Sequence, residues 1–150
     1  PSSLIFSIAR QESAWEFDAK SRVGAKGLMQ IMPATAKETA KKANIRYRKH
    51  KLFDPEYNIT LGSYYISSLL KQYDNNRALA IASYNAGPHR VKQWLARSEA
   101  SLPIDVWIEI IPFKETRKYV QNVLSYEVIY NYRQGKESSL LTLAEAKAIL

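Results

Sequence analysis

Prolines and glycines divide this chain into segments with helical periodicity, and no other feature of the sequence constrains the fold as strongly. Asp54-Pro55 is typical of a helix start, because an aspartate caps free N–H groups and a proline fits the first turn. The segment that follows places apolar residues four apart, at Leu61, Tyr65, Leu69 and Tyr73. This spacing predicts a long helix with one face in the core.

The other helices are bounded by the same kinds of residue. Asn75 or Asn76 caps one helix, Gly87-Pro88 ends it, Gly135 stops the longest helix and Thr142 opens a capping box. We expect helices over about 3–15, 34–43, 77–86 and 114–134, a short helix through 91–95 and a final helix after 142.

Three segments carry no helical pattern. Residues 44–53 are basic and irregular, residues 102–112 are a short apolar stretch, and the loop from 15 to 29 has room for a short hairpin. Strand alternation of useful length is missing. The predicted fold class is therefore all-α, with one compact domain over residues 1–150 and several helices around a single core.

The charge balance favours anionic partners. The chain has 22 Lys and Arg against 14 Asp and Glu, a net charge of +8, and its densest basic cluster runs from Lys41 to Lys51. Such a surface attracts nucleic acid, an anionic membrane or an anionic polymer, although a solvated loop is the simpler interpretation of the cluster. No apolar run approaches the length of about 18 residues that spans a membrane, and no signal peptide is visible.

Missing residues and motifs exclude several kinds of chemistry. Without cysteine the chain can form neither a disulfide nor a thiolate site. His50 and His89 are isolated, which argues against a zinc site. Dinucleotide, P-loop, serine-elbow and EF-hand motifs are absent from the sequence. Carboxylate chemistry and tyrosine hydroxyls remain.

Glu12 is the carboxylate that we expect to lose most hydration. In the first predicted helix Ile5, Ile8 and Ala9 form an apolar stripe, which Glu12 continues and Trp15 follows. Burial disfavours the charged form of a carboxyl, so we expect the pKa of Glu12 to be raised, as a general acid requires. The alternative is a structural glutamate that is satisfied by an arginine or a backbone amide.

Three further segments are candidates for a binding site. Residues 27–30 place a glycine turn before Gln30, whose amide suits sugar hydroxyls and N-acetyl groups, unless this turn simply packs Leu28 and Met29 into the core. Tyr84 and Asn85 lie among small residues at a helix end, where they either face a cleft or belong to a cap.

Glu115 and Tyr119 share a face of the longest helix at a spacing of four residues. The alternative is a glutamate favoured by the helix dipole beside a core tyrosine.

In their order these segments resemble a known family. The matching pieces are Ala-Arg-Gln-Glu-Ser-Ala-Trp at 9–15, Gly-Leu-Met-Gln-Ile-Met-Pro at 27–33, Tyr-Asn-Ala-Gly at 84–87 and Ile-Pro-Phe-Lys-Glu-Thr-Arg-Lys-Tyr-Val at 111–120. Together they resemble the catalytic domain of the soluble lytic transglycosylases of Gram-negative bacteria, in the goose-lysozyme-like superfamily. The resemblance implies a compact, lysozyme-like multi-helix domain with an active-site cleft, as the C-terminal part of a longer protein. Ser83 departs from the family, which usually has alanine there.

The resemblance also implies a reaction and its residues. The family cleaves the β-1,4 bond between N-acetylmuramic acid and N-acetylglucosamine without water, and leaves a 1,6-anhydromuramoyl end. Glu12 matches the sole catalytic acid and base. The matching substrate-binding positions are Ser13, Ser21, Met29, Gln30, Met32, Tyr84, Asn85, Glu115 and Tyr119. No cofactor and no metal are implied.

The same resemblance implies a monomeric periplasmic enzyme that acts on peptidoglycan glycan strands in cell-wall turnover, and no nucleic-acid partner. Three alternatives stay open. A hydrolytic lysozyme on the same fold would need a base to activate water, with Asp18, Glu109 and Glu115 as candidates. A glycan-binding module without activity is the second alternative, and a nucleic-acid binder, suggested by charge alone, is the third.

Overall fold

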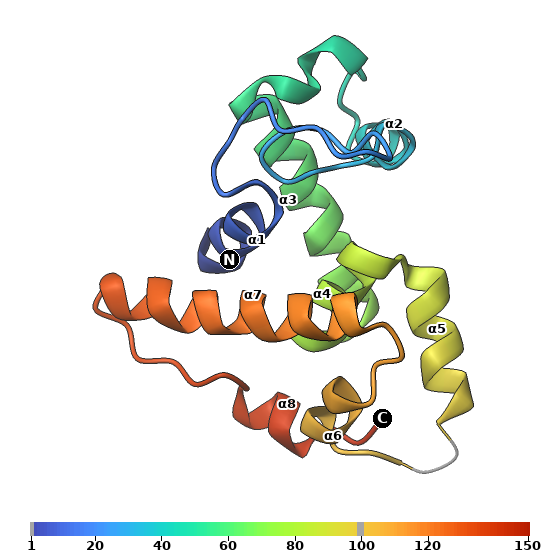
Figure 1. The fold of residues 1–150 in the computed structure, drawn as a ribbon, viewed down its shortest axis with the longest axis vertical. Helices are drawn as coiled ribbons and strands as arrows, with labels where there is room; N and C mark the ends of the chain where they lie inside the picture. The colour runs from blue at the N-terminus through green and yellow to red at the C-terminus, as the bar shows by residue number, and fades with distance from the viewer. Residues whose placement is uncertain (1, 99–100) are drawn as a thin grey trace. The chain divides into compact units, whose positions relative to one another are not determined.

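Cap residues read from the sequence set several of the helix boundaries. The computed structural model describes residues 2–98 and 101–150 (Figure 1). The helices are α1 (Ser2–Ser13), α2 (Pro33–Lys42), the 3-10 helix η1 (Lys49–Phe53), α3 (Pro55–Gln72), α4 (Arg77–Ala86), α5 (Pro88–Arg97), α6 (Ile104–Glu109), α7 (Lys114–Arg133) and α8 (Leu143–Lys147). Within the described residues β pairing is limited to isolated bridges, so the all-α class is confirmed.

Three predicted caps are formed by side chains. The Asp54 carboxylate accepts a hydrogen bond of 2.9 Å from the N–H of Tyr57, at the start of α3. Asn76 accepts one of 3.2 Å from the N–H of Leu79, at the start of α4. Thr142 and Glu145 form the reciprocal capping box of α8. Each bond satisfies an N–H group that has no partner inside its helix, which is why these sequence signals were reliable.

The first helix is shorter than the sequence indicates. α1 ends at Ser13, because Ala14 and Trp15 have φ angles of 50° and 72° and leave the helical region. The prediction that Trp15 continues the face of Glu12 is therefore wrong. A left-handed backbone conformation is typical of glycine, so an alanine and a tryptophan in the sequence do not indicate that the helix ends here.

The segments without a helical pattern are partly ordered. η1 occupies the second half of the basic segment 44–53, and α6 occupies the apolar stretch before Pro112. The loop after α1 forms two isolated bridges, from Lys26 to Lys20 and from Lys26 to Ile31, in place of a hairpin.

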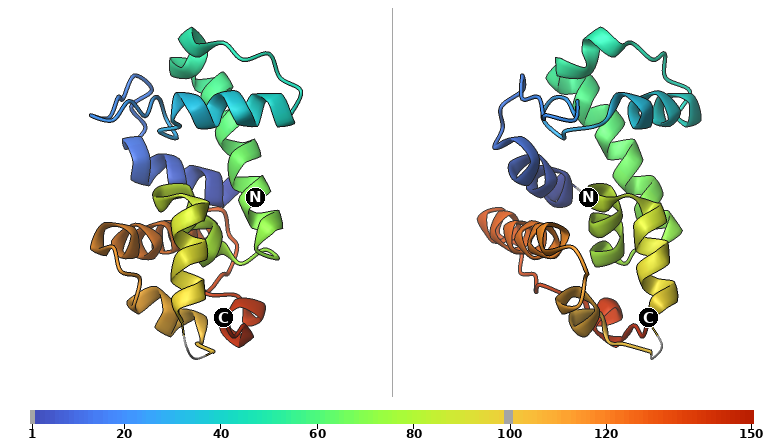
Figure 2. Two further views of the ribbon diagram at one scale, coloured as in Figure 1. Left: turned by 90° about the vertical axis from the view of Figure 1, so that its right-hand side faces the viewer. Right: turned by 45° about the vertical axis from the view of Figure 1, so that its right-hand side comes forward.

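The chain folds into two compact units, residues 1–68 and 69–150, with the boundary inside α3. In the first unit, α2 and η1 lie beside the N-terminal half of α3 in both views of Figure 2. Their contact buries an apolar cluster of Ile31, Ala36, Ala40, Leu52 and Leu61, against which Ile45, Tyr47 and Tyr57 pack. This cluster explains why α2, an otherwise polar helix, is held in place.

In the second unit α4 packs on α5 and α7, while α6 packs on α7 and α8. The middle of α4 is apolar, and its residues from Ala78 to Ser83 are all buried. One face of α7 is buried at Tyr119 and Val123 and half-buried at Tyr126 and Tyr130. The central helix of this unit is therefore α4, whose short side chains let its neighbours approach closely.

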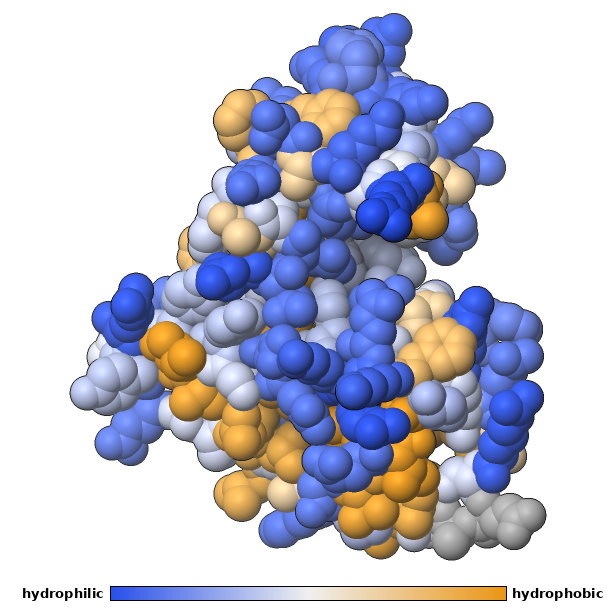
Figure 3. Space-filling view, in the orientation of Figure 1, coloured by the Kyte–Doolittle hydropathy of each residue, from blue (hydrophilic) through white to orange (hydrophobic). Residues whose placement is uncertain are grey.

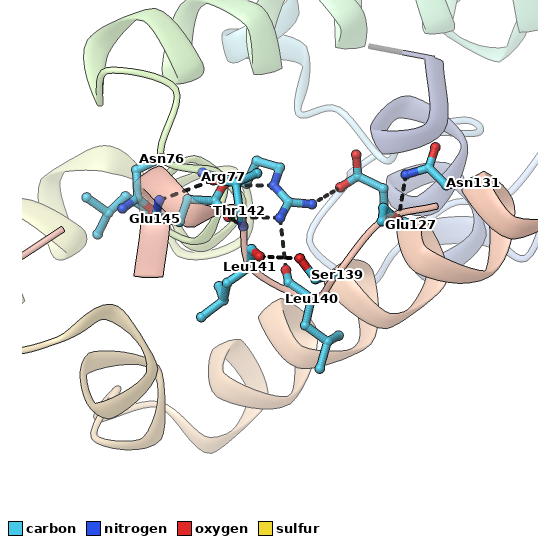
Figure 4. A network of polar contacts seen from close by, with 11 residues as sticks. Asn76, Arg77, Glu127, Asn131, Ser139, Leu140, Leu141, Thr142 and Glu145 are labelled. Atoms are coloured by element: carbon cyan, nitrogen blue, oxygen red, sulfur yellow. Dashed lines mark hydrogen bonds and ion pairs between the residues drawn. The ribbon is translucent and has the colours of Figure 1, made fainter. Parts of the chain in front are cut away.

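A buried ion network joins three helices of the second unit (Figure 4). Arg77 of α4 donates to Glu127 of α7 at 2.6 Å and to Glu145 of α8 at 2.8 Å. It also donates to the carbonyl of Leu140 at 2.9 Å. Burial alone would raise the pKa of Glu145, but hydrogen bonds from Arg77 and from the backbone N–H of Thr142 outweigh it and lower that pKa. The network ties the C-terminal segment to α4 and α7.

Candidate functional site

The predicted site residues fall into both units, and each set is described within its own unit. The first unit holds Glu12, Ser13, Ser21, Met29, Gln30 and Met32. The second unit holds Tyr84, Asn85, Glu115 and Tyr119.

Glu12 lies one residue before the end of α1 and is half-buried. Leu4 and Ile8 on the same helix are completely buried, whereas Ile5 and Glu12 are not, so Glu12 lies at the margin of the buried face. A carboxyl at such a margin loses part of its hydration and stays accessible to a ligand. That this carboxyl keeps its proton at neutral pH stays a prediction.

Ser13 follows Glu12 and is buried. Its hydroxyl donates to the carbonyl of Ala9 at 3.1 Å, one turn back in α1. This bond closes the last turn of α1.

The loop after α1 is fixed by its own hydrogen bonds. The amide nitrogen of Gln30 donates to the carbonyl oxygens of Ala19 at 2.9 Å and of Gly27 at 2.8 Å. Ser21 accepts a bond of 2.9 Å from the N–H of Ala25 through its hydroxyl oxygen. Both N–H groups of the Gln30 amide thus hold the loop.

Asn58 of α3 pins this loop from the inside, and sequence analysis missed it. It is completely buried and accepts from the N–H of Met29 at 2.8 Å. Its amide nitrogen donates to the carbonyls of Lys26 and Leu52, both at 2.8 Å. One side chain therefore satisfies three backbone groups from two segments, which positions the loop that carries Met29 and Gln30.

Two glycines allow this close packing. Gly27 has a φ of 79°, and a Cβ there would overlap the side chain of Asn58 and the carbonyl of Leu52. Gly62 of α3 faces the thioether of Met29, which would collide with any added Cβ. Met29 is fully buried, whereas Met32 is 38% exposed at the start of α2, so Met32 is the better placed of the two to meet a ligand.

In the second unit the structure brings the last two motifs together. Thr116 of α7 donates from its hydroxyl to the side-chain oxygen of Asn85 of α4 at 2.7 Å. Tyr84 and Asn85 are half-buried, Tyr119 is buried and Glu115 is exposed. The bond from Thr116 occupies the side-chain oxygen of Asn85 and so fixes the orientation of its amide.

Ser83, the departure from the family pattern, has a structural use. It is fully buried, and its hydroxyl donates to the phenol oxygen of Tyr73 at 2.8 Å. Alanine could not make this bond, which links α4 to the residue just after α3.

The candidates for a water-activating base are all exposed: Asp18, Glu109 and Glu115. Glu109 accepts a hydrogen bond of 3.1 Å from Gln121. Among residues 2–98 and 101–150 no group of three or more His, Asp or Glu side chains is placed to hold a metal ion. Over the same residues, no helix combines the length and the apolar character that crossing a bilayer requires.

Comparison with known proteins places the chain in a family. It belongs to the transglycosylase SLT domain family, whose sequence model matches residues 1–106. A second model, the soluble lytic transglycosylase helical domain, matches residues 110–139. The family resemblance read from the four motifs is confirmed.

Curated and solved relatives agree with this assignment. The chain is 46% identical over 147 residues to a soluble lytic murein transglycosylase of Escherichia coli (strain K12), covering 97% of this chain and 23% of the relative. The crystal structure of the 70-kDa soluble lytic transglycosylase of E. coli matches with a TM-score of 0.97 and 45% identity, over 100% of this chain and 25% of that one. An inactive mutant of lytic transglycosylase Slt from Pseudomonas aeruginosa matches with a TM-score of 0.93 and 50% identity, over 100% and 24%. The chain thus spans about a quarter of the length of these relatives.

Proposed function

We propose that this chain is the catalytic part of a peptidoglycan lytic transglycosylase, with Glu12 as its single acid and base. The observation that carries the proposal is the position of Glu12, half-buried at the end of α1 in a chain of the transglycosylase SLT family. The P. aeruginosa relative named above is described as inactive when a glutamate is replaced by glutamine, which supports a glutamate at the centre of the reaction.

The proposed reaction uses one carboxyl twice. Glu12, protonated, gives its proton to the glycosidic oxygen as the bond from C1 of N-acetylmuramic acid to that oxygen breaks. The resulting carboxylate takes the proton of the C6 hydroxyl, whose oxygen bonds to C1. The products are a free 4-hydroxyl on N-acetylglucosamine and a 1,6-anhydro ring, and Glu12 is protonated again. Most glycosidases need two carboxylates, but here the substrate supplies the nucleophile.

The other residues would orient the sugars. We assign contacts with the substrate to Met32 and to the carbonyl oxygen of Gln30 in the first unit. In the second unit we assign them to the Tyr84 hydroxyl and the Asn85 amide. These groups are half-buried or exposed, and the hydrogen bonds of Gln30 and Asn85 hold their amides in one orientation.

The remaining predicted residues take different proposed roles. Ser13, Ser21 and Met29 make internal contacts, so we assign them the support of α1 and of the loop. Tyr119 is buried, so we assign it a packing role within the second unit, whereas exposed Glu115 would contact substrate directly. Because the substrate is peptidoglycan, the expected location is the periplasm of a Gram-negative bacterium.

Replacing Glu12 by glutamine tests the assignment. The amide keeps the shape of the side chain but cannot give a proton, and general acid–base catalysis contributes up to about 10⁴-fold. Glu12→Gln should therefore reduce clearing of purified sacculi by at least that factor, with an unchanged circular dichroism spectrum. Glu16→Gln is the matched control, since Glu16 is exposed four residues further on and should retain full activity. Near wild-type clearing by Glu12→Gln would refute the role of Glu12.

A further inference from the structure

The first unit carries a groove that the proposed reaction does not use. It has a volume of about 500 Å³ and lies between the outer face of α2 and the segment after it. Its lining residues are Ala34, Lys37, Glu38, Lys41, Ile45 and Tyr47. We call it the α2 groove. None of these residues belongs to the motifs that define the candidate site.

The wall opposite α2 is held in a fixed conformation. The N–H of Ile45 donates to the carbonyl of Ala40 at 2.8 Å, which turns the chain back along α2. The Tyr57 hydroxyl donates to the carbonyl of Arg46 and accepts from the N–H of Arg48, both at 2.9 Å. Ile45 and Tyr47 also pack on the core cluster of this unit. The groove is thus built before any ligand arrives, which lowers the entropy cost of binding.

The groove is apolar inside and basic at its rim. Ala34, Ile45 and Tyr47 supply the apolar surface. Burial, and to a smaller extent the nearby Tyr57, raises the pKa of the Tyr47 hydroxyl. The hydroxyl therefore stays protonated and can donate a hydrogen bond across the neutral range. Glu38 is paired with Lys42 at 2.8 Å. Lys37 and Lys41 are exposed on the rim and form no ion pair within the described residues.

The surface around the α2 groove is also rich in positive charge. Between residues 37 and 51 the sequence has seven Lys and Arg against the single acid Glu38. Figure 3 shows hydrophilic residues over most of the surface that α2 and η1 form. Such a surface attracts carboxylates from a distance of about one Debye length, roughly 10 Å at 0.1 M salt.

We propose that the α2 groove binds the anionic stem peptides of peptidoglycan, as a substrate contact separate from the sugar site. This inference rests on the proposed function. Stem peptides combine free carboxylates with small apolar side chains, which matches lysines on the rim above an apolar floor. Nucleic acid and lipid headgroups offer phosphates without short apolar side chains between them, so they match only the charge of this surface.

Binding to two forms of the same cell wall tests the proposal. All proteins carry Glu12→Gln, so that the wall stays intact during the measurement. The groove variant adds Lys37→Gln and Lys41→Gln, and the matched control adds Lys92→Gln and Lys136→Gln at two exposed lysines of the second unit. Each is sedimented with intact sacculi and with sacculi whose stem peptides have been removed by an amidase, at 0.05 M and 1 M salt.

The groove variant should bind intact sacculi about 2- to 30-fold more weakly than the control at low salt, the range expected for two exposed ion pairs. This difference should vanish at 1 M salt and on stripped glycan. An equal affinity of both variants for intact sacculi would overturn the proposal, and so would an equal loss on stripped glycan, which would indicate a contact with sugars or a general effect of charge. A loss on anionic lipid vesicles without a loss on sacculi would assign the groove to membranes.

The result is separable from the proposed function. If the chain without Glu12→Gln releases anhydro products while the groove variant binds normally, only the stem-peptide inference fails. If the chain without Glu12→Gln releases no cleavage product and the Glu12→Gln protein does not bind sacculi, both the proposed function and the stem-peptide inference fail.

Discussion

Replacement of Asn58 should show how strongly the loop of the second motif depends on one side chain of α3. Asn58→Ala removes three hydrogen bonds, and two of the groups left behind, the N–H of Met29 and the carbonyl of Leu52, belong to completely buried residues. An unsatisfied buried group costs about 1–3 kcal/mol. Two such groups lower the expected free energy of unfolding by about 2–6 kcal/mol.

Asn58→Asp sharpens this prediction, because the new carboxyl keeps the acceptor for the N–H of Met29 and replaces the donor. Its second oxygen would face the carbonyls of Lys26 and Leu52 and could bond to them only if it carried a proton. The folded state therefore raises the pKa of this carboxyl above its unfolded value of about 3.9. A protonated carboxyl has one O–H and can donate to only one of these two carbonyls, so part of the stability is lost even at pH 4. Since the folded state binds more protons than the unfolded state, the loss relative to wild type grows as the pH rises to 7.

Urea denaturation followed by circular dichroism, at pH 4 and pH 7, measures both variants. Thr60→Ala is the control on the same helix, because its hydroxyl bonds to the carbonyl of Glu56 in the preceding turn and supports no other segment. It should change stability by less than about 0.5 kcal/mol. A deficit of Asn58→Asp that is the same at both pH values, or a stability of Asn58→Ala within that control range, would refute the reasoning.

Two further predictions concern the second unit. Arg77→Met leaves Glu127 and Glu145 buried without their partner, so it should cost about 3–5 kcal/mol at pH 7 in urea denaturation. Because the pKa of Glu145 is lowered, the network stabilises the folded state above about pH 4.5 and loses this effect as the pH falls. The stability deficit of Arg77→Met should therefore shrink at pH 4. A deficit that does not depend on pH would contradict the role of the ion pairs. Tyr84→Phe keeps the ring of a half-buried residue and should reduce turnover on sacculi more than stability. Tyr132→Phe, at a residue that is 81% exposed, should change neither. A large drop in melting temperature with unchanged activity per folded molecule would assign Tyr84 to the core.

The helix framework could be predicted because its signals are local. Asp54, Asn76 and Thr142 each cap an N–H group three residues away, so their role is visible in a short window of sequence. The end of α1 could not be predicted, because the left-handed conformations of Ala14 and Trp15 are imposed without a glycine. The same holds for Gln30, which has a φ of 47°.

The sequence identified the residues of the candidate site better than it identified what their side chains do. Asn58 escaped notice because its partners Lys26 and Met29 lie 32 and 29 residues away. Gln30 was identified as an amide that suits sugars, yet its N–H groups hold the loop, and only the structure could show this. Ser13 likewise belongs to the matching motif while its hydroxyl serves α1. Spacing along the chain indicates which residues belong to the candidate site. It does not distinguish a residue that contacts the ligand from one that holds such a residue in place.

The chemical form of the new muramic acid ends tests the central claim most directly. Muropeptides released from purified sacculi by this chain can be analysed by mass spectrometry before and after treatment with borohydride. If the C6 hydroxyl attacks C1 with Glu12 as acid and base, the main product has a mass one water below the hydrolytic product and resists reduction. Reducible ends as the main product would contradict the transglycosylase reaction and would mean that water, activated by another group, is the nucleophile.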